Sequence, residues 1–295
     1  MPSLSKHASN AYTKMLIMGD SGSGKTGALA SLVCDGFKLR ILDMDNGLET
    51  LKTFVEKNCP ANLENVEYRT LRDKYKSTAA GPIIDGVPKA FVEAVKMLDR
   101  WKYKDGDTEV DLGPPAEWGA ECILVIDSLT FLSDAAWDWR EPLTPRGSSG
   151  QYDKRAVYGD AQDAIEKVLA LLTGETFRTN VIVIAHIRYV DNPDGTKKGY
   201  PTAVGSALSP TIPRYFNSVA LCTNIAGKRS IQTTATAMID LKNPKPFEML
   251  PRYDLSDGLS KFFKVLRGDQ TIQVQEKKPT PAATLQPGLR RIGVK

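Results

Sequence analysis

The feature that most constrains the fold is a glycine-rich motif near the amino terminus. Residues 15–18 are apolar and run directly into the sequence GDSGSGKT, which has the form G-x-x-x-x-G-K-T. This spacing lets backbone N–H groups close around a phosphate, and the helix that follows directs its positive dipole end at the same anion. The motif therefore predicts a strand, a phosphate-binding loop and a helix in this order.

The motif predicts a site for ATP and Mg²⁺. Lys25 is expected to reach the β- and γ-phosphates, and Thr26 to hold Mg²⁺. Asp127 ends the apolar run 123–126, as does the Walker B carboxylate that binds Mg²⁺ together with Thr26. We expect ATP rather than GTP because no N-K-x-D-type segment is evident. The predicted nucleotide-binding residues are Gly19, Asp20, Ser21, Gly22, Ser23, Gly24, Lys25, Thr26 and Gly27.

Composition places the chain among globular proteins. Its 295 residues are 41% hydrophobic and 25% charged, and its longest apolar stretches are the size of strands rather than of membrane spans. Residues 1–10 lack the apolar core of a secretion signal. The four cysteines show no C-x-x-C spacing, which predicts reduced thiols in a cytoplasmic protein. The short apolar stretches predict no membrane partner.

Strand-like and helix-like segments alternate along the chain. Strands are expected at 38–43, 65–70, 122–127 and 180–185, and helices at 48–57, 88–103, 129–140 and 153–173, with a surface excursion at 104–118. Shorter strand-like runs follow at 218–223 and 230–239. This order predicts an α/β fold with a mostly parallel central sheet flanked by helices.

Three segments are expected along the chain. They are an N-terminal extension (1–13), an ATPase core (14–270) and a flexible basic tail (271–295). About a hundred residues separate the P-loop from Asp127. This interval leaves room for an added strand between the P-loop strand and the Walker B strand, which marks the ATPase branch that contains RecA and AAA+ proteins.

Four segments resemble RecA/RadA recombinases. The sequence ILDMDNGL at 41–48 is similar to the segment that follows the second strand of that family, where a carboxylate activates the attacking water. Asp45 falls on that position, where the family usually has Glu; alternatively, Asp43 and Asp45 only cap the next helix. Residues 126–129 resemble the Walker B segment. Residues 181–186 resemble the strand that senses the γ-phosphate, with His186 in place of the usual Gln or Asn.

The sequence LKNPKPF at 241–247 is similar to a RecA segment whose two lysines reach the γ-phosphate of a neighbouring subunit. The resemblance gives this role to Lys242 and Lys245 and implies a homo-oligomer, either a ring or a filament. It spans roughly residues 14–247 and lacks the additional domains of RecA/RadA proteins and DnaB helicases. A RecA-like core of this size resembles phage single-strand annealing recombinases, which implies the cytoplasm of the host cell.

The resemblance also implies two loops that bind single-stranded DNA. Both loops contain basic residues, and the second also contains aromatic ones, which suits phosphate neutralisation and base stacking. The residues concerned are Arg140, Arg146, Lys154 and Arg155 in the first loop, and Arg188, Tyr189, Lys197, Lys198 and Tyr200 in the second. The basic tail is a candidate contact for DNA or for a single-strand-binding protein, or a solubilising extension.

The predicted function is ATP hydrolysis stimulated by single-stranded DNA, in recombination or strand annealing. Three alternatives remain open at this point: a hexameric DNA motor similar to DnaB, a P-loop kinase, and a nucleotide-switched interaction protein.

Overall fold

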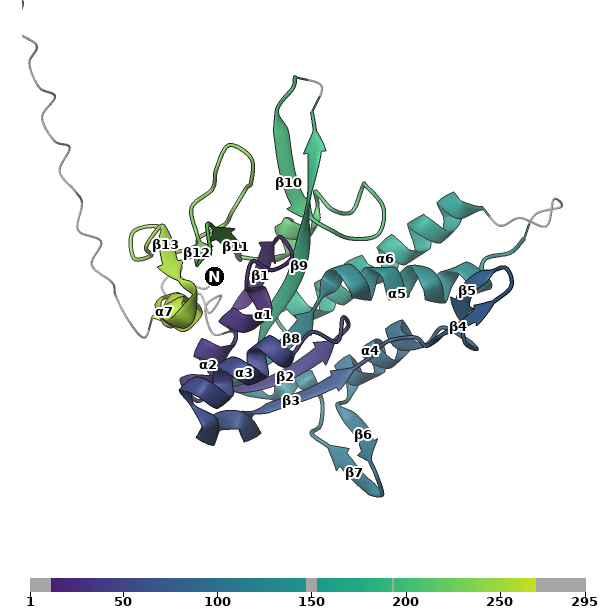
Figure 1. Cartoon of the computed structure of the whole chain (residues 1–295), viewed down its shortest axis with the longest axis horizontal. Coiled ribbons are helices and arrows are strands. Elements are labelled where there is room, and N and C mark those ends of the chain that lie inside the picture. Colours follow the sequence, from purple (N-terminus) through teal and green to yellow (C-terminus); the bar gives the residue numbers. More distant parts are fainter. Residues whose placement is uncertain (1–11, 147–152, 193, 269–295) are drawn as a thin grey trace, which may run out of the picture.

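The computed structural model describes residues 12–146, 153–192 and 194–268 (Figure 1). Its central sheet has the strand order β13-β12-β11-β1-β9-β8-β2-β3, and β10 extends it by pairing with β9. Six neighbouring strands, from β11 to β3, are parallel, while β10, β12 and β13 are antiparallel to their neighbours. The strands are β1 (Lys14–Gly19), β2 (Lys38–Asp43), β3 (Val66–Thr70), β8 (Gly119–Asp127), β9 (Thr179–Asp191), β10 (Lys197–Pro201), β11 (Ser218–Ile225), β12 (Lys228–Gln232) and β13 (Arg252–Asp254).

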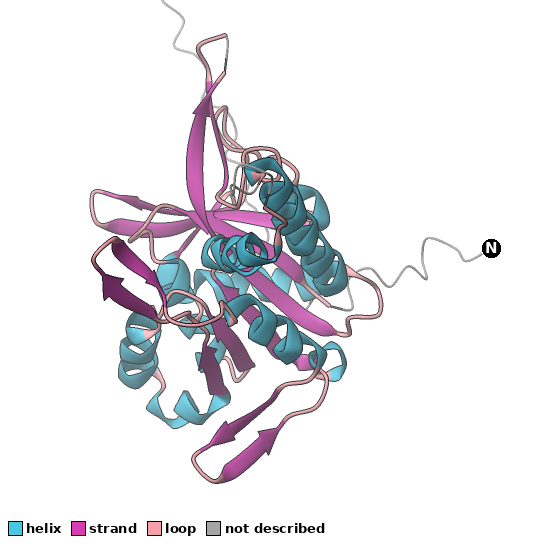
Figure 2. Cartoon of the chain, turned by 90° about the vertical axis from the view of Figure 1, so that its right-hand side faces the viewer, coloured by secondary structure: helices cyan, strands magenta, loops and turns pink. Residues whose placement is uncertain are grey.

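Helices cover both faces of the sheet (Figure 2). One core contains side chains of α1 (Lys25–Ala28), α2 (Ala30–Cys34), α3 (Glu49–Asn58) and α7 (Leu255–Arg267). The other contains side chains of α4 (Ala90–Asp99), α5 (Leu129–Arg140) and α6 (Lys154–Thr173). In β1, Met15 and Ile17 belong to the first of these cores, and Leu16 and Met18 to the second. A strand buried on both faces has a continuous apolar run rather than an alternating one, which explains why this strand is recognisable from sequence.

The strand expected between the P-loop strand and the Walker B strand is present. It is β9, which pairs with β1 on one side and with β8 on the other. Strand β9 follows the Walker B strand in the sequence. It therefore does not come from the long interval between the P-loop and Asp127. That interval instead holds β2, β3, α4 and two small hairpins.

Two hairpins lie outside the central sheet, and a third extends it. The separate hairpins are β4 (Tyr75–Thr78) with β5 (Gly81–Ile84), and β6 (Lys102–Asp105) with β7 (Thr108–Asp111). The third consists of the outer half of β9 together with β10, and it projects well beyond the sheet (Figure 1). Short 3-10 helices complete the chain at η2 (Pro60–Asn65), η3 (Pro115–Glu117), η4 (Glu141–Leu143) and η5 (Ile212–Tyr215). None of the helices in the described ranges is long and apolar enough to cross a membrane.

The expected elements largely coincide with the observed ones. The strand at 38–43 and the helix at 129–140 have the predicted bounds. The helix predicted over 88–103 ends at Asp99, since the Trp101 amide donates to the Gly113 carbonyl at 2.9 Å and β6 follows. The strand predicted over 230–239 ends at Gln232. The basic tail and residues 1–11 lie outside the described residues.

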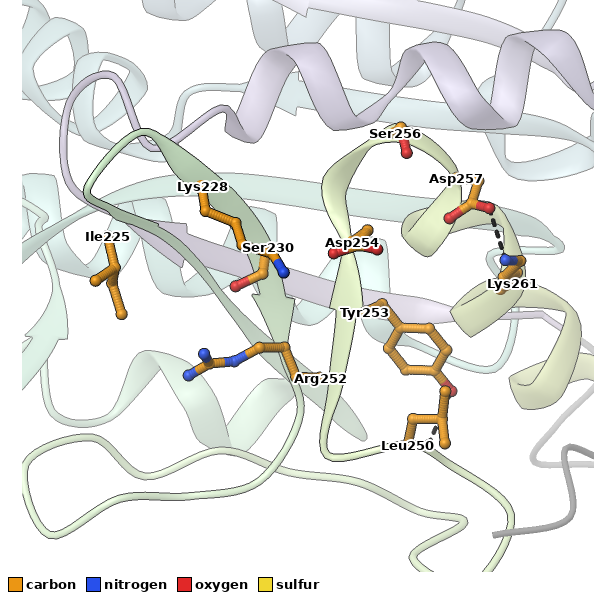
Figure 3. A pocket seen from close by; sticks show the side chains of 10 residues that line it. All are labelled: Ile225, Lys228, Ser230, Leu250, Arg252, Tyr253, Asp254, Ser256, Asp257 and Lys261. Carbon is orange, nitrogen blue, oxygen red and sulfur yellow. Dashed lines mark hydrogen bonds and ion pairs between the residues drawn. The ribbon is translucent and has the colours of Figure 1, made fainter. Parts of the chain in front are cut away.

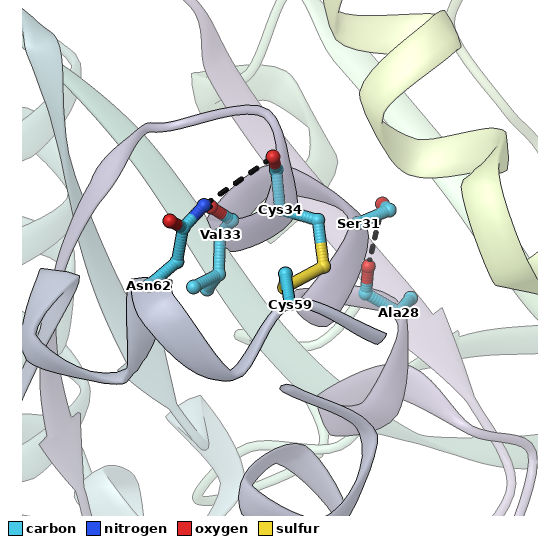
Figure 4. The surroundings of a disulfide bond; sticks show 6 residues. All are labelled: Ala28, Ser31, Val33, Cys34, Cys59 and Asn62. Carbon is cyan, nitrogen blue, oxygen red and sulfur yellow. Dashed lines mark hydrogen bonds between the residues drawn. A yellow bond between two sulfur atoms is a disulfide. The ribbon is translucent and has the colours of Figure 1, made fainter. Parts of the chain in front are cut away.

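The prediction of four reduced thiols is wrong for two of them. Cys34 at the end of α2 and Cys59 directly after α3 form a disulfide, with their Cα atoms 5.4 Å apart (Figure 4). The Asn62 side-chain amide supports this junction by donating to the Val33 carbonyl at 2.8 Å. Helix packing brings together two cysteines 25 residues apart, which a search for local spacings cannot detect. Cys122 and Cys222 are free.

Candidate functional site

The P-loop lies between β1 and α1 and depends on two of its glycines. A Cβ atom on Gly19 would lie 2.5 Å from the Ser23 hydroxyl and 2.6 Å from the Cys222 carbonyl. Gly24 has a φ of 97°, a left-handed conformation that side chains disfavour, and a Cβ atom there would lie 2.7 Å from Leu255. The loop is therefore held against β11 and α7 at positions where only glycine fits.

Lys25 begins α1 and is almost buried. Its ammonium group donates to the carbonyls of Gly19 at 3.0 Å and Asp20 at 2.9 Å, so its side chain folds back across the loop. Burial lowers the pKa of Lys25, and the nearby carboxylates of Asp127, Asp20 and Asp45 partly offset this effect. The ammonium group is thus positioned at the phosphate-binding loop among acidic groups.

Thr26 and Asp127 lie together although 101 residues separate them. The Thr26 hydroxyl donates to the Asp127 carboxylate at 2.7 Å, and Asp127 is only 1% exposed. Burial raises the pKa of the Asp127 carboxyl to about 7, and the hydrogen bond from Thr26 opposes this shift. A hydroxyl and a carboxylate are the oxygen donors that Mg²⁺ prefers, so the chemistry of the pair fits this ion.

Two further carboxylates lie beside Asp127 at the same edge of the sheet. Asp43 is the register partner of Asp127, and it accepts hydrogen bonds from the Thr70 hydroxyl at 2.7 Å and the Gly47 amide at 3.2 Å. Asp43 is therefore bound within its own loop. Asp45 differs, because its Oδ1 atom is buried without a hydrogen-bond partner. Burial raises the pKa of Asp45, and repulsion by Asp43 raises it further.

The geometry separates the two interpretations of this acidic pair. The amide of Gly47, in the turn before α3, bonds to Asp43, whereas α3 has no side-chain cap from Asp45. Arg72 donates to the Asp45 carbonyl at 3.3 Å and leaves the carboxylate available. Asp45 thus does not cap α3, and its Oδ1 atom has no hydrogen-bond partner.

His186 lies directly beside the P-loop. It is the register partner of Gly19, where β9 pairs with β1. Its backbone amide donates to the Thr130 hydroxyl at 3.1 Å, and that hydroxyl donates to the Thr202 carbonyl at 3.0 Å. Burial lowers the pKa of His186, and the charge of Lys25 lowers it further, so the imidazole is neutral at neutral pH.

Several neighbours of the P-loop were not predicted from sequence. Arg229 on β12 donates to the Gly22 carbonyl at 3.3 Å, and Leu255 begins the helix that packs on Gly24. The buried thiol of Cys222, whose pKa burial raises to about 12, lies behind the loop. Among these neighbours, only Arg229 is marked in the sequence, as one of two consecutive basic residues. Its contact with Gly22 could not be predicted, because that contact depends on the position of β12 in the sheet.

A cavity of about 480 Å³ opens beside this region (Figure 3). It lies between the β11–β12 hairpin, β13 and the first turns of α7, and one ion pair, Asp257 with Lys261 at 2.6 Å, lies on its wall. The lining residues are Ile225, Lys228, Ser230, Leu250, Arg252, Tyr253, Asp254, Ser256, Asp257 and Lys261.

Lys242 and Lys245 lie away from the P-loop of their own chain. Lys242 pairs with Val219 near the start of β11, whereas the P-loop follows the opposite end of the neighbouring strand β1. The Lys242 ammonium donates to the carbonyls of Pro213 at 2.7 Å and Phe216 at 3.1 Å, and Lys245 pairs with Glu248 at 3.4 Å. Neither lysine lies in the nucleotide site of this chain.

The residues predicted to bind DNA fall into two groups on the surface. In the first, Arg140 pairs with Asp160, while Arg146, Lys154 and Arg155 are exposed on either side of residues outside the description. In the second, register places Arg188 opposite Tyr200 on the projecting hairpin. Lys197 pairs with Asp191 at 3.4 Å, and Lys198 with Asp240 at 2.8 Å.

One comparison with known proteins, a family match, agrees with this site. A family model described as AAA domain matches residues 11–244, well over half of the chain. No curated protein matches it. Among solved structures, the chain is similar to a prototypical ATPase from the type III secretion system of pathogenic bacteria, at 14% identity and a TM-score of 0.36 over 72% of this chain and 51% of that one.

It is also similar to the ATPase EscN, solved in complex with its central stalk EscO from the type III secretion system of enteropathogenic E. coli. The identity is 15% and the TM-score 0.38, over 72% of this chain and 42% of that one. The chain thus matches about half the length or less of these two ATPases. From the family match and the P-loop geometry, we conclude that the chain belongs to the AAA domain family and is a P-loop ATPase.

Proposed function

We propose that this ATPase is Mg²⁺-dependent, works as a homo-oligomer, and couples ATP hydrolysis to binding of single-stranded DNA during recombination or strand annealing. The observation that carries the proposal is the continuity of β9. This strand passes His186 beside the P-loop and continues without a break into the exposed hairpin that bears Arg188 and Tyr189. A rigid strand joins the nucleotide site to a basic and aromatic surface.

In the proposed mechanism, this chain's residues bind and orient the triphosphate. Lys25 exchanges its two carbonyl partners for the β- and γ-phosphates, and the P-loop amides surround the β-phosphate. Thr26 and Asp127 hold Mg²⁺, which when bound neutralises phosphate charge. The free oxygen of Asp45 orients the attacking water. Because Asp is one methylene shorter than the Glu usual in the family, the distance from the carboxylate to this water is longer.

His186 is the proposed link between hydrolysis and DNA. Its neutral imidazole can donate a hydrogen bond to the γ-phosphate, and a small shift of β9 on loss of that phosphate would be passed to the hairpin. On the hairpin, Arg188, Lys198 and Tyr200 share one face because their positions alternate in register. Such a surface neutralises phosphates and stacks on bases. Residues of the first loop, Arg146, Lys154 and Arg155, are a second proposed contact.

The test measures ATP hydrolysis by the purified chain with and without single-stranded DNA. We expect stimulation that Lys25→Ala abolishes and that Arg188→Ala combined with Lys198→Ala reduces without lowering the basal rate. Lys104→Ala on the β6–β7 hairpin is the matched control, because it removes an exposed positive charge from another hairpin. If DNA neither stimulates hydrolysis nor binds, the DNA part of the proposal fails while the ATPase assignment stands.

Assays of unwinding, of phosphate transfer and of nucleotide binding separate the alternatives. Strand unwinding would identify a motor similar to DnaB, and phosphate transfer to a small acceptor would identify a kinase. Nucleotide binding without turnover would identify a switch that binds partner proteins.

A further inference from the structure

One aromatic side chain projects from the surface in a fixed turn. Phe247 is 91% exposed, more than any other large apolar side chain in the described residues. The turn that carries it is tied by the Lys245 amide, which donates to Asn243 at 2.9 Å, and by the Met249 amide, which donates to the Lys245 carbonyl at 3.2 Å. Met249 is buried, and Pro246 limits the conformations of the turn. Phe247 is thus held ready for a contact at little entropic cost.

An apolar groove of about 650 Å³ lies between α3 and the edge strand β3. Leu51 and Val55 of α3 are buried and line it, and Leu63 and Val66 are only partly buried. Tyr68 is 56% exposed at its rim. The groove therefore offers apolar surface that an aromatic side chain can cover.

The turn and the groove belong to opposite edges of the sheet. The turn leads directly into β13, the last strand at one edge, whereas the groove runs along β3, the last strand at the other. We call the exposed Phe247 side chain the knob. Because the knob and the groove lie on different surfaces, two copies cannot use one and the same patch to form a two-fold symmetric dimer. They form a head-to-tail contact that continues into a ring or a filament.

Charge favours the same pairing. The turn carries Lys242 and Lys245 against one acidic residue, Glu248, which pairs with Lys245 at 3.4 Å. The groove is lined by Asp43, Glu49 and Glu56 against one basic residue, Lys52, which pairs with Glu56 at 3.9 Å, so the turn is net positive and the groove net negative. The groove also extends to Asp43 and Asn46, close to Asp45 of the candidate active site. A lysine arriving with the knob would thus approach the nucleotide of another copy, although both lysines lie away from the nucleotide of their own chain.

We propose that Phe247 of one copy docks in the groove between α3 and β3 of the next copy, so that the chain assembles head to tail. This inference rests on the homo-oligomer of the proposed function and identifies its interface. The C-terminal tail is the competing occupant of the groove, and the cross-linking experiment below distinguishes it.

Sedimentation velocity of the full chain, with Mg²⁺ and a non-hydrolysable ATP analogue, tests the contact. Phe247→Ala and Tyr68→Asp should each raise the concentration for half-maximal assembly at least about tenfold. Both side chains are exposed, so the variants should keep the wild-type melting temperature. Val87→Ala and Leu143→Asp, which change side chains 79% and 56% exposed, are the matched controls and should assemble normally.

Mixing the two variants gives a sharper result. Phe247→Ala retains its groove and Tyr68→Asp retains its knob, so an equimolar mixture should form dimers and stop there. If the wild-type chain stays monomeric, both the homo-oligomer and this interface are overturned. If the wild-type chain and Phe247→Ala assemble equally well, only the interface is overturned.

A photoreactive benzophenone side chain at position 247 locates the contact. Cross-links between copies to peptides within 48–68 support the proposal. Cross-links from position 247 to other segments only would overturn it. In a second variant with the benzophenone in the tail, cross-links to 48–68 would assign the groove to the tail.

Discussion

At the scale of single residues, the site consists of carboxylates whose surroundings differ. Asp43 is hydrogen-bonded by Thr70, Asp127 by Thr26, and one oxygen of Asp45 has no partner. The unpartnered oxygen makes Asp45 the strongest candidate for orienting water. We predict that Asp45→Asn lowers kcat at least about 100-fold while ATP still binds, because the amide cannot accept the proton. Asp45→Glu, the conservative control, should retain hydrolysis. Equal losses in both variants, measured by phosphate release alongside nucleotide titration, would count against this role.

The raised pKa of Asp127 predicts a pH-dependent stability. Between an unfolded value near 3.8 and a folded value of about 7, the folded protein binds more protons than the unfolded chain. The contribution of Asp127 to the free energy of unfolding is therefore fully present below about pH 4 and is lost as the pH rises through 7. In EDTA and without nucleotide, Asp127→Asn should melt several degrees above the wild-type chain at pH 8, and by a smaller margin at pH 5. A pH-independent difference in thermal melts would contradict this explanation.

Residue-level prediction is most direct where a local motif specifies the chemistry. Lys25, Thr26 and Asp127 follow from two short patterns, and the structure brings Thr26 and Asp127 to 2.7 Å. Arg229 was missed because its contact with Gly22 depends on how β12 pairs with β11 and on how β11 pairs with β1. Pairing of strands distant in sequence leaves no local signal.

At the scale of elements, the buried parallel strands were recognisable because both of their faces are apolar. Most of the β6–β7 hairpin was expected only as a surface excursion, and its first two residues as the end of the helix predicted over 88–103, since its strands are short, charged and exposed. A signal was present in the Gly106–Asp107 pair, the two residues between β6 and β7, because Gly106 adopts a φ of 58° at the turn.

The link between α2 and α3 yields a stability prediction. The Cys34–Cys59 disulfide closes a loop of about 25 residues and stabilises the fold by about 3 kcal/mol. Reduction, or Cys34→Ser combined with Cys59→Ser, should lower Tm by roughly 6–12 °C. Cys122→Ser, which changes a free thiol, is the control and should melt as the wild-type chain does under either redox condition. Equal melting of the oxidised and reduced wild-type chain would show that the bond adds no stability.

At the scale of the whole molecule, the placement of Lys242 and Lys245 yields a test of the proposed homo-oligomer. Lys242 pairs with Val219 near the start of β11, and Lys245 pairs with Glu248, whereas the P-loop follows the far end of β1. In the proposed oligomer, another copy would therefore bring these lysines to a nucleotide. We therefore predict complementation. Lys25→Ala has an inactive P-loop but intact lysines, and Lys242→Ala combined with Lys245→Ala has the reverse. Each variant alone should hydrolyse ATP at a small fraction of the wild-type rate, and specific activity of the wild-type chain should rise with its concentration.

In an equimolar mixture of these two variants, about a quarter of head-to-tail contacts join an intact P-loop to intact lysines if the copies mix at random. Activity should therefore recover to roughly a quarter of the wild-type rate. Adding Phe247→Ala to both variants should abolish the recovery, because the copies no longer meet. A mixture that is no more active than its components, at concentrations where sedimentation shows mixed assemblies, would mean that the lysines act only within their own chain, where they bind the carbonyls before β11 and Glu248.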